Sequence, residues 1–378
     1  MRMAKSKKTV NGISKPGQLE IRNFKSLKHI KIDTSRVNVF IGKPNSGKSN
    51  LLEAMTLFNF IQRGSPDSPS AIRYKSLNQL FYDTNTAKEI VVEYNNNLAT
   101  LWYQKNANFF VQIINPKYSY EKLKDLMSSY GFPMSGFSLG EIGEIVTQPS
   151  VHSESNRFAS KAAVLSQDGQ SAASSMGAIH IENPIRKYDF REGHAYGENF
   201  AGYLKEHGQN LYSIVQESPE IREWIKPFFD QYGLEFLMDF NTKAFEIQRI
   251  EKGIAYKIPF ELTPDTLRRM LFNIAAIYSN SNSTILFEEP EAHSFPPYIK
   301  ELSELIKQDF NNTYFITTHS PYFFSSMVED SIAIKDISFF HVYFDDYQTK
   351  IKKLTQGDLD NIWGNGVDVF FNIDSLDR

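Results

Sequence analysis

One eight-residue segment constrains the fold of this chain more than any other feature of the sequence. Residues Gly42–Ser49 read Gly-Lys-Pro-Asn-Ser-Gly-Lys-Ser, which fits the P-loop pattern G-x-x-x-x-G-K-[ST]. The apolar residues Val37–Ile41 before the loop predict a buried strand, and apolar residues at helical spacing predict a helix over Asn50–Arg63. A strand, a glycine-containing loop and a helix in this order indicate an α/β fold with a phosphate-binding loop.

The residues of this loop have distinct expected roles. Glycines let the backbone curl, so that successive N–H groups and the helix N-terminus face phosphate oxygens. Lys48 is expected to neutralise the β- and γ-phosphates, and Ser49 to give one oxygen to Mg²⁺. The alternative is a glycine-rich turn that binds no nucleotide. The residues predicted to bind the nucleotide here are Gly42, Asn45, Ser46, Gly47, Lys48, Ser49 and Asn50.

Two adjacent carboxylates follow a second predicted strand. Glu288 and Glu289 come directly after the apolar stretch Thr284–Phe287. In an open α/β sheet the carboxyl ends of the strands form the edge at which phosphates bind. At that edge one carboxylate can hold the Mg²⁺ shell, and the next can orient and deprotonate an attacking water. A Glu-Glu-Pro-Glu run alone is more often a solvated turn, but the buried strand and the P-loop favour the functional interpretation.

A histidine is expected at the same edge. Residues Tyr314–Thr317 predict the next strand, and a helix between the two strands indicates that they are parallel. The strand runs into Thr318-His319-Ser320-Pro321, which places His319 near the carboxylates. Its imidazole could contact the γ-phosphate there, although a histidine at a strand end is more often structural.

Taken together, these motifs resemble a known family. Ile21–Ser26 reads Ile-Arg-Asn-Phe-Lys-Ser, and with G-K-S-N-L-L-E-A, E-E-P-E-A-H and T-T-H-S-P it is similar to ABC-type ATPases of the RecF, SMC and OLD group. The resemblance covers residues 18–63 and 260–325. It implies an α/β fold, namely an ABC-type P-loop ATPase head with an antiparallel β-meander subdomain and a helical lid insertion. It also implies ATP and Mg²⁺ as cofactors, with Lys25 and Ser26 flanking the nucleotide.

The resemblance further implies the catalytic roles. Glu288 corresponds to the acid that holds the metal together with Ser49, although the family usually has aspartate, which is one methylene shorter. Glu289 corresponds to the catalytic base and His319 to the switch histidine. The implied reaction is hydrolysis of ATP to ADP and phosphate.

The family's signature segment is the main departure. A Ser-x-Gly sequence usually precedes its helix, and Thr263–Arg268 stands there in this chain. The resemblance implies that Thr263 and Thr266 contact the nucleotide of a second copy. Asp265 occupies the glycine position and adds both bulk and negative charge beside a phosphate. Hydrolysis across a dimer interface would then be weak, or would need a partner to complete it.

The domain organisation follows from these motifs and from composition. We expect a flexible basic segment at 1–17, an N-terminal ATPase half with a β-meander at 18–116, and a helical lid at 117–230. The C-terminal ATPase half occupies 231–378. Within the lid, residues 160–178 are rich in Ser, Ala, Gln and Gly and predict a flexible loop.

Three further polar residues have ordinary interpretations. Gln79 is a candidate for the family's Q-loop glutamine on position alone, and a glutamine at a helix end is the more common case. Asp345 and Asp346 lie between two β-rich runs and predict a hairpin turn rather than a metal site.

Composition and charge exclude several classes of protein. The chain has no cysteine, which excludes disulfides, thiolate zinc sites, iron–sulfur clusters and cysteine nucleophiles. No apolar run is long enough to span a bilayer, so we expect a cytoplasmic protein without a membrane partner. The net charge is −3, but residues 1–31 contain nine Lys or Arg against one Glu. That basic end is either a solubilising tail or an arm for double-stranded DNA.

Three functions are compatible with the sequence. No heptad run indicates a long coiled-coil arm, and the 59 residues after His319 are too few for an appended nuclease domain. The first hypothesis is an ATPase subunit that dimerises head to tail and controls a separate effector, such as a nuclease or toxin, in bacterial anti-phage defence. The second is a RecF-like DNA-repair ATPase that binds double-stranded DNA. The third is a weakly hydrolysing, ATP-gated scaffold that sequesters a toxic protein partner.

Overall fold

A computed structural model describes most of the chain, in two compact units. The first, here the P-loop unit, consists of Gly17–Thr34, Val39–Lys187 and Phe339–Arg378, and the second, here the acidic-edge unit, contains Ser35–Asn38 and Tyr188–Ser338. None of the described helices has the length and apolar character required to cross a membrane. The described residues are 17–59, 71–95, 97–104, 108–115, 159–168, 171–174, 184–191, 202–329, 336–364, 369–370, 373 and 376. Residues 1–16 of the predicted flexible segment 1–17 and most of the first part of the predicted lid lie outside them, while Gly17 begins the first strand.

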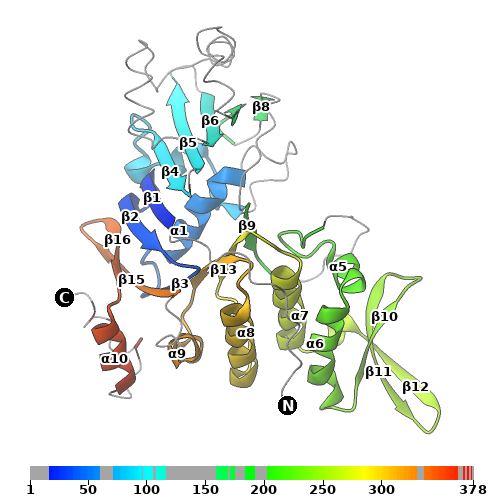
Figure 1. Ribbon diagram of the computed structural model, residues 1–378. Coiled ribbons are helices and arrows are strands. Elements are labelled where there is room, and N and C mark those ends of the chain that lie inside the picture. Colours follow the sequence, from blue (N-terminus) through cyan, green and yellow to red (C-terminus); the bar gives the residue numbers. More distant parts are fainter. Residues whose placement is uncertain are drawn as a thin grey trace. The chain divides into compact units, whose positions relative to one another are not determined.

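An antiparallel sheet dominates the P-loop unit (Figure 1). Its first two strands form because apolar residues alternate with polar ones, so that Leu19 and Ile21 face Ile32 and Ile30 across the pair. The β-meander predicted within residues 18–116 is part of this sheet and is confirmed. In sheet order the strands are β2 (Leu27–Thr34), β1 (Gly17–Phe24), β4 (Ile90–Tyr94), β5 (Asn97–Gln104), β6 (Asn108–Asn115), β7 (Ala159–Leu165) and β8 (Ser171–Ser174).

The last two strands of this sheet correct the sequence-based prediction of a flexible loop over 160–178. β7 pairs with β6 along its whole length, from Phe109 opposite Leu165 to Asn115 opposite Ala159, and β8 pairs with β7. Alanine, the most frequent residue of these two strands, has little strand preference of its own, but the backbone edge of β6 offers hydrogen-bond partners. The predicted lid is therefore not helical throughout its described part.

The P-loop follows the strand β3 (Val37–Ile41) and leads into the short helix α1 (Lys48–Met55). The predicted strand over Val37–Ile41 is confirmed as β3, but α1 is shorter than the helix predicted over Asn50–Arg63. A 3₁₀ turn follows at Thr56, whose hydroxyl donates a hydrogen bond to the Glu53 carbonyl. The other elements are η1 (Thr56–Asn59), η3 (Leu77–Leu80), η4 (Tyr82–Thr84), β15 (Ile337–Asp345), β16 (Gln348–Lys353) and α10 (Gln356–Gly364).

A tight hairpin joins the last two strands. Asp345 pairs with Gln348, and the two residues between them, Asp346 and Tyr347, both have positive φ. This is the conformation that a two-residue hairpin turn requires. The predicted hairpin turn is confirmed.

The acidic-edge unit is built around two parallel strands, β13 (Thr284–Glu288) and β14 (Thr313–Thr317), connected by α8 (Pro296–Gln308). Apolar residues fill both strands because both faces of a parallel sheet are covered. The predicted strand–helix–strand arrangement is therefore confirmed. The unit also contains α5 (Leu211–Glu217), α6 (Pro219–Asp230), η5 (Phe260–Leu262), α7 (Asp265–Tyr278) and α9 (Pro321–Glu329). The last residue of β9 (Ile185–Tyr188) belongs to this unit as well.

A second antiparallel sheet in this unit is a three-stranded meander. It consists of β10 (Glu235–Asp239), β11 (Ala244–Glu251) and β12 (Ile254–Pro259). Phe245 on β11 is buried against Phe236 and Phe260, whereas every residue of β12 is exposed.

One buried arginine fastens the C-terminal end of α8. Arg36, immediately before β3, is 1% exposed and forms an ion pair with Asp336. Its guanidinium also donates to the backbone oxygens of Ile306, Lys307 and Asp309. A guanidinium can satisfy several carbonyls at a helix C-terminus, where the helix dipole also favours a positive charge.

We expect Arg36→Ala to lower the free energy of unfolding by about 3–5 kcal/mol, because Asp336 and three carbonyls lose their buried donor. Urea denaturation measures this loss. Lys226→Ala is the matched control, since it removes an exposed ion pair with Asp230 and should cost about 0.5 kcal/mol or less. Equal losses in the two variants would contradict the role given to Arg36.

Candidate functional site

The P-loop holds its lysine among its own backbone oxygens. The Lys48 ammonium donates to the carbonyl of Gly42 at 2.7 Å and to that of Lys43 at 2.8 Å. Lys48 is buried, while Ser49 beside it on α1 is half-buried. The lysine is therefore directed into the curl of the loop, where the pattern requires it to meet phosphate.

Close contacts leave no room for a side chain at either glycine of the loop. A Cβ on Gly42 would lie 2.0 Å from the carbonyl oxygen of Val342, and one on Gly47 would lie 2.0 Å from the Thr349 hydroxyl. Gly47 also has a φ of 99°, which disfavours every other residue. Asn45 has a φ of 61°, which asparagine tolerates better than most residues. The loop conformation thus depends on strands that come about 300 residues later in the chain.

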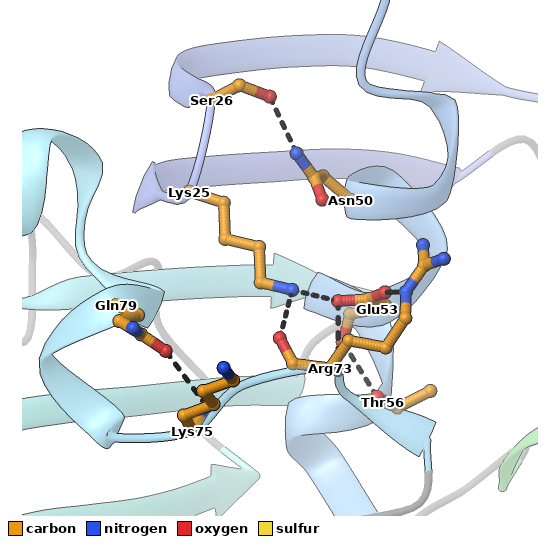
Figure 2. Close-up of polar contacts among 8 residues, drawn as sticks. All are labelled: Lys25, Ser26, Asn50, Glu53, Thr56, Arg73, Lys75 and Gln79. Atoms are coloured by element: carbon orange, nitrogen blue, oxygen red, sulfur yellow. Dashed lines mark hydrogen bonds and ion pairs between the residues drawn. The ribbon is translucent and has the colours of Figure 1, made fainter. Parts of the chain in front are cut away.

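Hydrogen bonds join the P-loop to the hairpin between β1 and β2. Figure 2 shows Asn50 of α1 donating its side-chain amide to the Ser26 hydroxyl at 2.8 Å. Ser26 in turn contacts the Thr349 hydroxyl at 2.7 Å, and Thr349 donates to the carbonyl of Ser46. Ser26, Asn50 and the loop are therefore brought together as predicted, and Thr349 is an additional member of the group.

Lys25 contacts an acidic side chain and a backbone carbonyl of its own unit, while its role beside the nucleotide remains a prediction. Its ammonium forms an ion pair with Glu53 and donates to the carbonyl of Arg73 at 2.7 Å (Figure 2). Arg73 forms a second ion pair with the fully buried Glu53, with Nε 2.6 Å from the carboxylate. Burial lowers the pKa of Lys25 below its ordinary value, and the Glu53 carboxylate opposes that shift. Lys25 thus links the hairpin to α1.

The ordinary interpretation of Gln79 is confirmed. Its side-chain oxygen accepts from the backbone N–H groups of Lys75 at 2.8 Å and Ser76 at 3.3 Å, which forms a capping box at the start of η3 (Figure 2).

The acidic-edge unit brings the predicted carboxylate and histidine together. Glu288 pairs with Thr317 across β13 and β14, so Glu289 and Thr318 both follow directly from the carboxyl ends of parallel strands. Oε1 of Glu289 lies 3.7 Å from Nε2 of His319. Glu289 is exposed and Glu288 half-buried, which leaves both carboxylates accessible. The placement predicted for these three side chains is as observed, while their roles remain predictions.

A third glutamate, which the sequence did not single out, lies beneath this pair. Glu291 is 6% exposed, and its Oε1 accepts from the Thr318 hydroxyl and from the backbone N–H of His319 at 3.3 Å. Burial raises the pKa of Glu291 from 4.5 to about 7, and the nearby charge of Glu289 adds to the rise.

The signature segment lies at the start of α7 in the same unit. The Thr266 hydroxyl donates to the carbonyl of His293 at 2.6 Å, which ties α7 to the turn after Glu289. Asp265 is bound by Arg269 at 2.6 Å and by Arg268 at 3.5 Å. The negative charge expected to oppose phosphate at this position is therefore compensated by two guanidinium groups. Thr263 is buried.

The predicted site residues divide between the two units. The structure brings Lys25, Ser26 and the P-loop together in one, and the signature threonines, Glu288, Glu289 and His319 together in the other. Sequence reasoning missed Thr349, Glu53 and Glu291. The sequence signal that could have identified Glu53 and Glu291 was their position as acidic residues inside recognised motifs. No sequence signal pointed to Thr349.

Comparison with known proteins identifies one family and one similar curated protein. Residues 17–258 match the family model described as an AAA ATPase domain. The chain is also 23% identical, over 360 residues, to a protein of Helicobacter pylori (strain ATCC 700392 / 26695) named ATP/GTP phosphatase. That likeness covers 90% of this chain and 92% of the relative.

Among solved structures, the chain has a weak likeness to SMC heads. An SMC head bound to the C-terminal winged-helix domain of ScpA is 14% identical with a TM-score of 0.46, covering 91% of this chain and 99% of that one. The SMC head domain from Thermotoga maritima is 11% identical with a TM-score of 0.39, covering 89% and 98%.

The raised pKa of Glu291 predicts a dependence of stability on pH. Between about pH 4.5 and pH 7 the unfolded chain releases this proton while the folded chain keeps it, so the free energy of unfolding falls as pH rises. The shift corresponds to about 3 kcal/mol. Urea denaturation across this range should show the fall in the wild type relative to Glu291→Gln, which has no carboxyl to titrate. Parallel profiles for the two proteins would contradict the prediction.

Proposed function

The chain belongs to the AAA ATPase domain family and is an ATPase, and from this premise we propose that it works as a head-to-tail dimer that controls a separate effector. In this proposal ATP binds between the P-loop of one copy and the start of α7, Thr263–Arg268, of the other. ATP binding closes the dimer, and hydrolysis opens it, because the closed state contacts the γ-phosphate and the open state does not.

The chemistry of the site residues supports this assignment of roles. Lys48 neutralises the β- and γ-phosphates, Glu289 accepts the proton of the attacking water, and His319 contacts the γ-phosphate. A serine hydroxyl and a carboxylate suit Mg²⁺, so Ser49 and Glu288 are the proposed metal ligands. Mg²⁺, when bound, supplies charge neutralisation between the phosphates. The side chain of Glu288 is one methylene longer than that of the family's usual aspartate, so its carboxylate lies farther from the backbone.

The pairing of Asp265 with two arginines carries the head-to-tail proposal. An unpaired aspartate at this position would repel the γ-phosphate of a second copy. Arg268 and Arg269 compensate that charge and leave one positive charge in excess at the start of α7. The helix dipole adds to this positive potential. The same pairing argues against the scaffold hypothesis, which rests on impaired hydrolysis.

The effector and the anti-phage role rest on the resemblance to the RecF, SMC and OLD group. Members without their own nuclease often serve as the ATPase half of a defence system, in which a nuclease or toxin is the partner. A nucleotide-controlled dimer suits this task, because its two states present different surfaces to a partner protein. The name of the Helicobacter pylori relative suggests that GTP should be tested beside ATP.

A mixing experiment tests the head-to-tail arrangement. Lys48→Ala removes the phosphate-binding cation, and Arg269→Glu reverses one of the two positive charges that compensate Asp265 at the start of α7, so that this end of the helix would repel a partner's phosphate. We expect each variant alone to lose steady-state ATP hydrolysis. An equimolar mixture should recover about a quarter of the wild-type rate, because each mixed dimer contains one intact composite site.

The control mixes Lys48→Ala with Glu289→Gln. In the proposed arrangement both residues act from the same copy, so no mixed dimer has an intact site and the rate should stay at the background level. Absence of recovery in the first mixture, despite exchange of subunits shown by size-exclusion chromatography, would contradict a head-to-tail dimer.

The DNA-repair alternative is favoured by the basic N-terminal end, of which residues 1–16 lie outside the described part of the chain. If the effector proposal is correct, linear double-stranded DNA should change ATP turnover less than about twofold. A several-fold stimulation that weakens with salt and disappears on deletion of residues 1–17 would instead support the DNA-repair function.

A further inference from the structure

The turn after β13 is held in an unusual backbone conformation. Glu289 has a φ of 48°, a left-handed value that is uncommon for glutamate. Its backbone N–H donates to the carbonyl of Thr317 at 2.9 Å, and its carbonyl accepts from Ala292 at 2.9 Å. A strained residue persists only where surrounding contacts fix it, and such residues gather at functional sites.

The side chain of Glu291 crosses from this turn to the one that carries His319. Its Oε1 accepts from the hydroxyl of the fully buried Thr318 and from the backbone N–H of His319. The Thr318 hydroxyl also accepts from the backbone N–H of Ser320 at 3.0 Å. One carboxylate oxygen therefore fixes the second turn relative to the first at two points.

The same turn is also fastened from the side of α7. The Asn273 side-chain amide donates to the carbonyl of Pro290 at 3.1 Å, and Thr266 donates to that of His293. Glu291 thus completes a continuous set of contacts that runs from the signature helix, through the turn after Glu289, to His319.

Stability alone gives a poor account of a glutamate at this position. Its Oε2 is buried and has no hydrogen-bond partner among the described residues, although its Oε1 accepts two hydrogen bonds. Leaving a buried polar atom unpaired costs about 1–3 kcal/mol. A buried polar group that lacks a partner requires an explanation, and a role at the neighbouring site provides one.

We propose that Glu291 is a positioning residue for ATP hydrolysis, which sets the separation of Glu289 and His319 by holding their two turns together. This inference rests on the roles proposed above for Glu289 and His319. Because a misplacement of about 1 Å can slow an enzyme about a hundredfold, the contact affects kcat. Loss of the Glu291 contact leaves nucleotide binding unchanged, since the conformation of Lys48 and the rest of the P-loop does not depend on this contact.

Steady-state kinetics of four variants test the proposal. Glu291→Ala removes both hydrogen bonds between the turns, and Thr318→Val removes the one from the hydroxyl; both should lower kcat, about 10- to 100-fold for Glu291→Ala, while the KM for ATP changes less than about twofold. Thr318→Ser keeps the hydroxyl and should restore most of kcat. If Glu291→Ala fails to fold, Glu291→Gln still offers one acceptor oxygen to Thr318 and should retain more activity than Thr318→Val.

Ser303→Ala is the matched control, because Ser303 is fully buried in the same unit and its hydroxyl bonds to Ser326, which joins α8 to α9 rather than one turn to the other. It should lower the melting temperature without lowering kcat. The proposal is overturned if Glu291→Ala and Thr318→Val keep a wild-type kcat, or if Ser303→Ala lowers kcat as much at the same loss of melting temperature.

Glu289→Gln separates this inference from the function on which it rests. A wild-type rate in Glu289→Gln would overturn the proposed role of Glu289. A slow Glu289→Gln beside a wild-type rate in Glu291→Ala would overturn the positioning role alone.

Discussion

The P-loop can adopt its shape only because two glycines allow strands from the far end of the chain to approach it. The Thr349 hydroxyl and the Val342 carbonyl occupy the space that side chains at Gly47 and Gly42 would fill. Thr349 then binds both the loop, at the Ser46 carbonyl, and the hairpin at Ser26. The conformation of the phosphate-binding residues is therefore a property of the assembled P-loop unit rather than of the loop alone, and folding must bring in β15 and β16 before the site exists.

The division of the site residues between two units separates two tasks. The P-loop unit contains the residues proposed to hold phosphate, and the acidic-edge unit contains those proposed to act on the attacking water and the γ-phosphate. Each group is ordered by its own contacts, Ser26 with Asn50 in one and Glu289 with His319 in the other. Binding and hydrolysis should therefore respond to different substitutions, as a protein controlled by nucleotide state requires, because such a protein must bind ATP before hydrolysing it.

Sequence reasoning succeeded where the signal was local. The P-loop, the two carboxylates and His319 each follow a short apolar strand, so their placement at strand ends could be predicted from periodicity and motif spacing. It failed where the structure depends on a distant partner. β7 forms because β6 offers a free edge, and Thr349 reaches the P-loop because of strand pairing, neither of which alters the local composition. The environment of Lys25 was missed for the same reason, since its partners Glu53 and Arg73 come 28 and 48 residues later.

Two buried glutamates differ in how the cost of burying their charge is compensated. Glu53 has two cations, Lys25 and Arg73, which compensate the cost of removing its charge from water. Within the described part of the chain, the hydrogen-bond partners of the Glu291 carboxylate are a hydroxyl and backbone N–H groups rather than a cation, and burial raises its pKa. Selection for stability alone favours the first arrangement. A carboxyl whose pKa is strongly raised by folding lowers the protein's free energy of unfolding near neutral pH. The second arrangement persists directly beneath Glu289 and His319, where a fixed distance between two turns matters more than the stability that it costs.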